Sequence, residues 1–294
     1  MKNTHIFKLH FFYKSLFLAF VCLFIFGAVN VFSLESPCTG TTSLIIGQKK
    51  YDSVERGITF KNAENVLASD HGTFLMTLDE NANFPTTLGK TVIINHNDGL
   101  QTIYGNLEEV TELVSDVQSG TIIGKVGESG FSEKNSLLFQ VVDTIQKAKI
   151  NPLLLISLYS DRYAPQLRSL QLVNMQGIAY PLTQNRNISK GEYYIYSDSV
   201  DSIFNSNTFF PVFKTITYLN GTEIASLSYE TMSEKKGKLF FQSSENDQID
   251  ETNIRKGYNR IGKINLKQGK NNISVELSDL AGNTRTFQWI VFVN

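Results

Sequence analysis

The stretch TVIINHNDGLQTIYGNL, residues 91–107, predicts a β-hairpin and with it a β-rich fold. Thr91–Ile94 is an apolar, β-branched run of the kind that favours a strand. Asp98 and Gly99 follow as a turn, because Asp-Gly adopts positive φ at low cost. The return, Leu100–Tyr104, alternates apolar and polar residues, as a half-buried strand does. We therefore expect two antiparallel strands joined by a short turn.

Sequence on the C-terminal side of this hairpin predicts more short strands. Between Val114 and Gly130, glycines recur among valines and isoleucines, which indicates tight turns and close strand crossings, not a flexible linker. Leu137–Val142 is another apolar run typical of a buried strand, and Asn151-Pro152 interrupts the chain after it. We expect these strands to complete one β-domain.

A second β-region is expected further along. Gly191–Tyr196 and Phe213–Leu219 have the composition of strands. Asn220-Gly221 follows the second strand and predicts a tight hairpin turn. Near the C-terminus, Ile273, Val275 and Leu277 alternate with polar residues before a turn at 279–283. This pattern predicts the last hairpin of a small antiparallel sandwich.

The N-terminus has the features of a targeting segment. Lys2, Lys8 and Lys14 precede a long apolar run, Leu16–Phe32, and small residues follow near Ser33. This order predicts a secretory signal peptide cleaved near Ser33, or an uncut membrane anchor as the alternative. Cleavage would remove three lysines and no acid, which takes the net charge from −1 to −4. An acidic chain without a basic stripe argues against nucleic acid as a partner.

The cysteine content does not predict a disulfide framework. Cys22 lies in the leader, so Cys38 is alone in the remaining chain and is expected to be a spare thiol.

The composition, with 41% apolar and 19% charged residues, is that of folded globular protein. The expected parts are a signal peptide at 1–33, a lead-in at 34–49, a β-domain at 50–157, a linker at 158–170 and a β-sandwich at 171–294.

Four segments in consistent order resemble the β-sheet core of the LytM/lysostaphin-type zinc endopeptidases, which cut peptidoglycan cross-links. Each segment alone is weakly specific, but together they keep the family's order and spacing over residues 54–154. The segments are Arg56–Ile58 with Ala68–Thr73 downstream, Val92–Leu107, Val117–Gly130, and Ser136–Gln140 followed by Asn151–Leu153. The second β-region resembles the Ig-like modules of bacterial envelope proteins. The expected fold class is all-β: a LytM-type core (duplicated hybrid motif) followed by an Ig-like antiparallel β-sandwich.

The resemblance also implies that the family's chemistry is lost. Such a zinc needs three ligands of the histidine or carboxylate kind and an open position for water. The family's ligand positions hold Glu55, Thr59 and Leu138, and its two catalytic histidine positions hold Asn106 and Ser136. Leucine offers no metal-binding atom, and asparagine and serine cannot act as the general base. We expect no catalytic residue and no bound zinc.

The other histidines do not restore a metal site by themselves. Outside the leader the chain has His71 and His96, and we expect both to be solvated surface residues. Asp70 with His71 would bind zinc only if folding brought a third donor close. Glu55 is the one altered ligand position that keeps a carboxylate for this alternative.

Three functional hypotheses follow. The first is a non-catalytic envelope protein that binds peptidoglycan or a cell-wall hydrolase such as an amidase. Its groove would be lined by Glu55, Thr59, Tyr104, Asn106, Ser136 and Leu138. The second is an active zinc endopeptidase with displaced ligands, and the third is a structural envelope module. All three imply an exported protein of the periplasm or cell envelope, with membrane contact only through an uncleaved leader.

Overall fold

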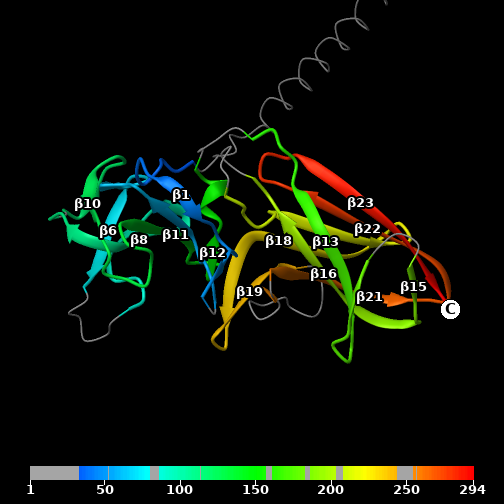
Figure 1. Cartoon of the computed structure of the whole chain (residues 1–294). Coiled ribbons are helices and arrows are strands. Elements are labelled where there is room, and N and C mark those ends of the chain that lie inside the picture. The colour runs from blue at the N-terminus through cyan, green and yellow to red at the C-terminus, as the bar shows by residue number, and fades with distance from the viewer. Residues whose placement is uncertain are drawn as a thin grey trace, which may run out of the picture. The chain divides into compact units, whose positions relative to one another are not determined.

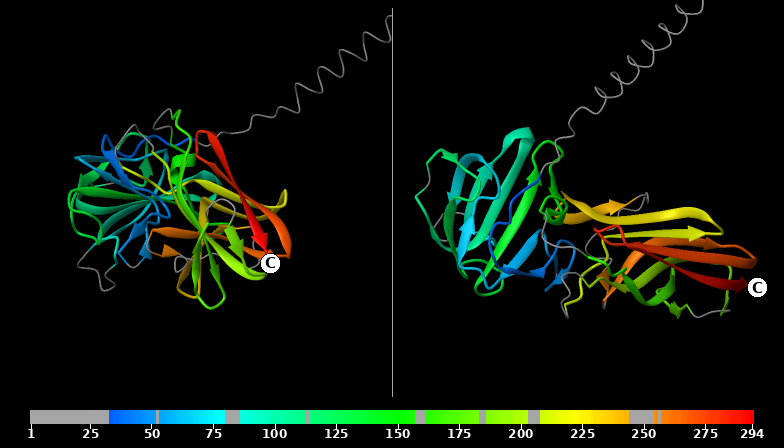
Figure 2. Two further views of the ribbon diagram at one scale, coloured as in Figure 1. Left: turned by 45° about the vertical axis from the view of Figure 1, so that its right-hand side comes forward. Right: turned by 90° about the horizontal axis from the view of Figure 1, so that it is seen from above.

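The computed structural model of the chain describes residues 33–51, 53–79, 86–112, 114–156, 161–182, 186–202, 208–243, 254–255 and 257–294. Apart from Ser33, the predicted signal peptide lies outside these residues. Within them the structure consists of strands and two short 3-10 turns (Figures 1 and 2). No helix in this part of the chain is long and apolar enough to cross a bilayer. The all-β prediction is confirmed.

The N-terminal β-region is built around the predicted hairpin. Val92 of one strand faces Tyr104 of the other and Ile94 faces Thr102, and Gly99 takes a φ of 77° in the turn. The elements of this region are β1 (Thr41–Leu44), β2 (Lys49–Lys50), β3 (Ser53–Val54), β4 (Ile58–Lys61), β5 (Asn65–Leu67), β6 (Gly72–Leu78), β7 (Lys90–Asn95), η1 (Asn97–Gly99), β8 (Leu100–Val110), β9 (Asp116–Val117), β10 (Ile122–Val126), β11 (Ser136–Asp143), β12 (Ala148–Ile150) and η2 (Pro152–Leu154).

Strands β4, β11 and β8 lie side by side and bring distant residues together. Thr59 of β4 pairs with Leu138 of β11, and Leu138 also pairs with Gly105 of β8. Beneath them the rings of Tyr104 and Phe139 pack at 5.2 Å between centroids in a fully buried core. The register of these three strands therefore brings Thr59, Leu138 and Gly105, which precedes Asn106, into one neighbourhood.

The C-terminal β-region is a sandwich of two layers. One layer has the order β14-β13-β16-β21-β20, and the other contains β15-β23-β22-β17-β18 with β19 beside β18. Both layers contribute apolar side chains to a single buried core. Its strands are β13 (Gln166–Asn174), β14 (Ala179–Pro181), β15 (Arg186–Ile188), β16 (Gly191–Val200), β17 (Lys214–Leu219), β18 (Thr222–Lys235), β19 (Lys238–Ser243), β20 (Ile254–Arg255), β21 (Tyr258–Leu266), β22 (Gly269–Ser278) and β23 (Thr284–Val293).

The sandwich agrees with most of the sequence-based expectations and departs from two. The final hairpin pairs Ile273 with Trp289 and Val275 with Phe287, as expected. However, β13 begins at Gln166, inside the segment predicted to be a linker. One pairing is also parallel, that of β15 with β23, so the sandwich is not wholly antiparallel.

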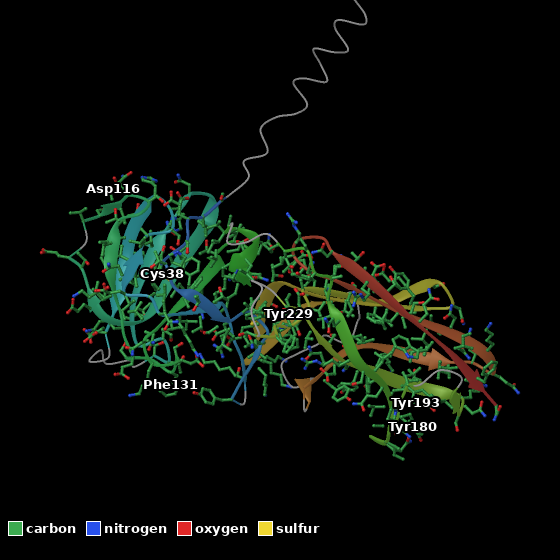
Figure 3. All side chains as sticks on the ribbon, turned by 45° about the horizontal axis from the view of Figure 1, so that its top comes forward. Cys38, Asp116, Phe131, Tyr180, Tyr193 and Tyr229 are labelled. Carbon is green, nitrogen blue, oxygen red and sulfur yellow. The ribbon has the colours of Figure 1, made fainter. Side chains whose placement is uncertain are left out.

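The two β-regions are joined by main-chain pairing and by a shared core. Strand β12 pairs with β18, with Lys149 opposite Met232. Ile46 of the lead-in belongs to the core of the sandwich. Nearby Gly47 has a φ of +81°, and a Cβ added there would lie 2.3 Å from the ring of Tyr229, which Figure 3 labels. Residues Leu34–Asn294 accordingly form one compact unit.

Candidate functional site

The first group of site residues surrounds the carboxylate of Glu55, just before β4. The Lys50 ammonium lies 3.1 Å from Glu55 Oε2, and the Thr59 hydroxyl donates to the same oxygen at 3.0 Å. The amide of Arg56 donates to Oε1 at 2.8 Å. Glu55 is only 3% exposed. Both carboxylate oxygens are thus bound within the protein, and the negative charge is matched by Lys50.

These residues do not fit a zinc ion. Glu55 is engaged by a cation, and the Thr59 hydroxyl is a weak ligand that already donates its proton to Glu55. Leu138, opposite Thr59 on β11, has no atom that a metal binds. Zinc sites of the catalytic kind need three strong donors converging on one point with a fourth position open. The paired Glu55 carboxylate, the Thr59 hydroxyl and the Leu138 side chain do not supply that arrangement.

Asn106, which the sequence resemblance assigns to a catalytic histidine position, has a structural role. Its backbone φ is 67°, a left-handed conformation that asparagine tolerates better than most residues. Its Nδ2 donates to the carbonyl oxygens of Gly127, Glu133 and Ser136 at 2.9, 3.1 and 2.6 Å. The amide of Gly130 donates to its Oδ1 at 2.8 Å. Asn106 therefore holds the segment from Gly127 to Ser136 in place.

Ser136, at the other catalytic position, takes part in the same network. Its hydroxyl donates to the carbonyl oxygen of Glu133, three residues before it. Its own carbonyl oxygen accepts the shortest of the bonds from Asn106. Among the described residues, neither side chain contacts a carboxylate or imidazole that would raise its basicity. The two residues therefore hold the segment between them in place and offer no general base.

The six residues predicted to line a groove are brought together, but their side chains are covered. Glu55, Thr59, Tyr104, Asn106, Ser136 and Leu138 are each 6% exposed or less. Burial raises the pKa of the Tyr104 hydroxyl, which accepts a hydrogen bond from the Ser69 amide at 2.8 Å. A ligand would reach these six side chains only if the covering segments moved.

The two histidines differ in environment. The side chain of His71 is 52% exposed, as expected, and its Nε2 lies 3.1 Å from Asp116 Oδ1. The surface prediction for His96 is wrong, because His96 is 4% exposed. Its Nδ1 lies 2.8 Å from the His71 carbonyl oxygen and its Nε2 lies 2.7 Å from the Thr102 hydroxyl. His96 thus links the turn at His71 to the β7–β8 hairpin, and it is not free to bind a metal.

The thiol of Cys38 is buried and free. Burial raises its pKa to about 11, against a smaller opposing effect of a hydrogen bond from the Gly40 backbone. A thiol that stays protonated at neutral pH is a poor nucleophile and a poor metal ligand. The prediction of a spare thiol therefore agrees with the environment of Cys38.

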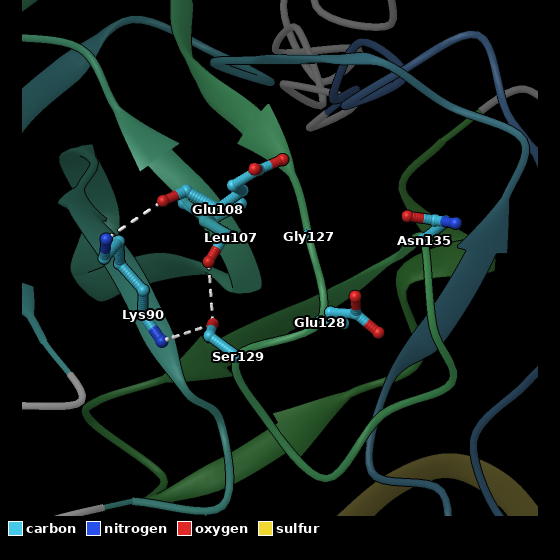
Figure 4. Close-up of a pocket in the computed structure, with 7 residues that line it drawn as sticks. All are labelled: Lys90, Leu107, Glu108, Gly127, Glu128, Ser129 and Asn135. Atoms are coloured by element: carbon cyan, nitrogen blue, oxygen red, sulfur yellow. Dashed lines mark hydrogen bonds between the residues drawn. The ribbon is translucent and has the colours of Figure 1, made fainter.

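An open cavity of about 250 Å³ adjoins the Asn106 network, and residue patterns alone did not indicate it. The Ser129 hydroxyl accepts from the Lys90 amide at 2.8 Å and donates to the Leu107 carbonyl oxygen at 2.7 Å (Figure 4). The Lys90 ammonium donates to the Glu108 carbonyl oxygen at 2.9 Å. The lining residues are Lys90, Leu107, Glu108, Gly127, Glu128, Ser129 and Asn135.

Comparison with known proteins identifies the N-terminal region. Residues 53–152 match the model of peptidase family M23. These residues form an M23-type domain. The LytM-type resemblance is thereby confirmed for this part of the chain. A second family model matches residues 164–294.

Several individual proteins are similar to the chain. An uncharacterized protein of Treponema pallidum (strain Nichols) is 28% identical over 143 residues, which cover 43% of this chain and 97% of the relative. A putative peptidase M23 from Pseudomonas aeruginosa is 22% identical with a TM-score of 0.36, over 45% of this chain and 53% of that structure. The SpoIIQ–SpoIIIAH pore-forming complex contains a chain 22% identical with a TM-score of 0.35, over 43% and 92%. This chain thus spans about half the length of the Pseudomonas structure.

Proposed function

We propose that the M23-type domain has lost zinc and peptidase activity, and that the chain is a non-catalytic binding or regulatory protein of the cell envelope. Its partner would be peptidoglycan or a cell-wall hydrolase such as an amidase. The leader at 1–33 would direct export, and the second β-region would serve as an Ig-like module beside the M23-type domain.

The ion pair between Lys50 and Glu55 carries this proposal. In a working site the residues at the ligand positions would present unpaired donors to the metal. Here the carboxylate at the first position is neutralised by an ammonium 3.1 Å away and is buried. Zinc at this carboxylate would have to compete with the Lys50 ammonium, and the displaced ammonium would lose its partner in a mostly buried place. The second support is Asn106, which binds four main-chain groups and whose carboxamide neither gains nor loses a proton near neutral pH.

Metal content and hydrolysis together test the loss of activity. Purified protein is analysed for zinc after dialysis against zinc-containing buffer, and dye-labelled peptidoglycan is used to detect cleavage. We expect substoichiometric zinc and no dye release. One tightly held zinc per chain, lost together with hydrolysis in His71→Ala, would establish the endopeptidase with displaced ligands instead.

Binding is tested separately, with attention to the accessible cavity next to Asn106. We place contact with cell-wall material there, because the six family positions are covered while the cavity opens to solvent. Glu108 lines the cavity and Glu109, the next residue of β8, does not. We expect the protein to cosediment with purified sacculi, Glu108→Trp to abolish this binding, and Glu109→Trp to retain it. If neither sacculi nor an envelope hydrolase binds the wild-type protein, the structural-module hypothesis is favoured.

A further inference from the structure

Three aspartates from distant parts of the sequence meet at one end of the sandwich. Asp161 precedes β13, Asp201 directly follows β16, and Asp279 directly follows β22. One carboxylate oxygen from each lies within 4.8 Å of the other two. Asp201 is 2% exposed and Asp279 is 4% exposed. The three side chains therefore converge on a point that is largely shielded from water.

The negative charge of this cluster is not matched by the protein. Among the described residues, no lysine, arginine or histidine forms an ion pair with any of the three aspartates. Buried carboxylates are normally paired with cations or coordinated to metal ions. The cluster has the donors of a cation site, and no cationic side chain of the described residues pairs with it.

Two of the carboxylates also have oxygens without hydrogen-bond donors. Asp161 Oδ2 is buried and has no partner. In the described part of the chain, the Asp201 carboxylate receives one hydrogen bond, from the Ser202 amide to Oδ1 at 2.9 Å. Native proteins leave few buried polar atoms unsatisfied, so each such atom calls for an explanation. A cation bound between the carboxylates would satisfy both.

We propose that Asp161, Asp201 and Asp279 bind a calcium ion. All three donors are hard carboxylate oxygens, which calcium prefers. Oxygens bound to one calcium ion at about 2.4 Å lie no more than roughly 4.8 Å apart, which matches the spacing of this cluster. Asn283 already holds the third carboxylate in position, since its amide and Nδ2 each donate to Asp279 at 2.8 Å. The remaining ligands would be water and main-chain oxygens.

Such an ion would fasten three segments of the sandwich to one another. It would tie the segment that enters the sandwich to the end of β16 and to the turn of the last hairpin. The Asn283 side chain bridges two of these segments, because its Nδ2 also donates to the Asp161 carbonyl oxygen at 3.3 Å. Calcium binding is therefore expected to stabilise the folded sandwich and to be independent of any ligand of the M23-type domain.

Thermal unfolding of the purified protein tests the proposal. After treatment with EDTA and its removal, Tm is measured at pH 8 without metal, with calcium chloride and with magnesium chloride. Saturating calcium is expected to raise Tm by about 5 °C or more, because a ligand that binds only the folded state stabilises it. Isothermal titration is expected to show one calcium ion per chain. Magnesium, which gives up its water less readily, is expected to produce a smaller shift.

Two variants distinguish the site from nonspecific effects of salt. Asp201→Asn keeps the shape of the side chain and removes one of the crowded charges, so it is expected to fold and to lose the calcium-dependent shift. Asp198→Asn, on the same strand but outside the cluster, is expected to keep it. The proposal is overturned if calcium leaves the wild-type Tm unchanged, or if Asp201→Asn retains both the shift and the stoichiometry of the wild type.

Discussion

The M23-type domain and the sandwich each bury carboxylates, but the carboxylate of the first is paired with an ammonium and those of the second lie next to one another. In the M23-type domain, Glu55 is paired with Lys50 and with the Thr59 hydroxyl, so nothing further is needed at that position. In the sandwich, Asp161, Asp201 and Asp279 face one another without a matching cation among the described side chains. The comparison teaches that a buried acid is informative only together with its partners. A matched carboxylate indicates a closed site, and an unmatched cluster indicates a missing ligand.

The largest effect is expected from opening the network at Asn106. Asn106→Ala removes the four hydrogen bonds to main-chain groups and leaves those buried groups unsatisfied, so we expect a loss of about 4 kcal/mol or more in the free energy of unfolding. Chemical denaturation monitored by circular dichroism measures this loss. Asn135→Ala is the control, since Asn135 also has a positive φ but is exposed. If both variants lose the same stability, the backbone conformation and not the network explains the role of Asn106.

A smaller effect is expected from breaking the ion pair between Lys50 and Glu55. Glu55→Ala leaves the Lys50 ammonium without its partner in a mostly buried environment, and we expect a loss of about 3 kcal/mol. Replacing both residues with methionine removes the unpaired charge and is expected to restore most of the stability. Glu109→Ala breaks the exposed pair with Lys125 and is expected to lose less than about 1 kcal/mol. Equal losses of unfolding free energy in Glu55→Ala and Glu109→Ala would show that the Lys50–Glu55 pair contributes no more than an exposed ion pair.

The two hairpins and several of the individual strands could be predicted from sequence, and so could a set of candidate positions. Residues 91–107 and the final hairpin encode their structure locally, through alternation and through turn residues between adjacent strands. The positions Glu55, Asn106 and Ser136 could be found because the glycines and apolar residues around them keep a fixed spacing. Predictions of this kind depend on contacts that are short in sequence or on a pattern that the chain retains.

What the sequence did not reveal depends on the placement of side chains and on contacts between distant segments. Lys50 is the first residue of the predicted β-domain, and only folding shows that its ammonium reaches Glu55, five residues later. The burial of His96 follows from the turn at His71, which lies 25 residues earlier. The pairing of β12 with β18 joins two regions that had been expected to be separated by a linker. Asp161, Asp201 and Asp279 are each unremarkable in sequence, and only the sandwich brings them together.

At the junction between the two regions, Lys149 of β12 is a third kind of buried ionisable group, one whose charged form is disfavoured by burial. Burial, and then the nearby charge of Arg56, lower the pKa of Lys149 to about 8, and Glu234 and Glu55 offset this only in part. The ammonium donates to Gln140 Oε1 at 2.7 Å. Because the charged form is disfavoured in the folded protein, the unfavourable contribution is full below about pH 8. It fades as the pH rises toward the unfolded pKa of 10.5.

Replacing Lys149 is expected to give the smallest change in the free energy of unfolding among the three buried sites compared. Lys149→Met removes the buried charge and also the bond to Gln140, so at pH 7 we expect a net gain of about 2 kcal/mol in the free energy of unfolding. The gain is expected to shrink as the pH rises from 8 to 10.5, because the wild-type lysine then loses its charge in the folded state. Urea denaturation at pH 7, 8.5 and 10 measures the trend, and Lys125→Met, at an exposed position, controls for general effects of charge. A gain that does not change with pH would mean that the added apolar contacts, and not the relieved charge, stabilise the junction. The charge of Lys149 would then be compensated by its surroundings, as the charge of Lys50 is compensated by Glu55.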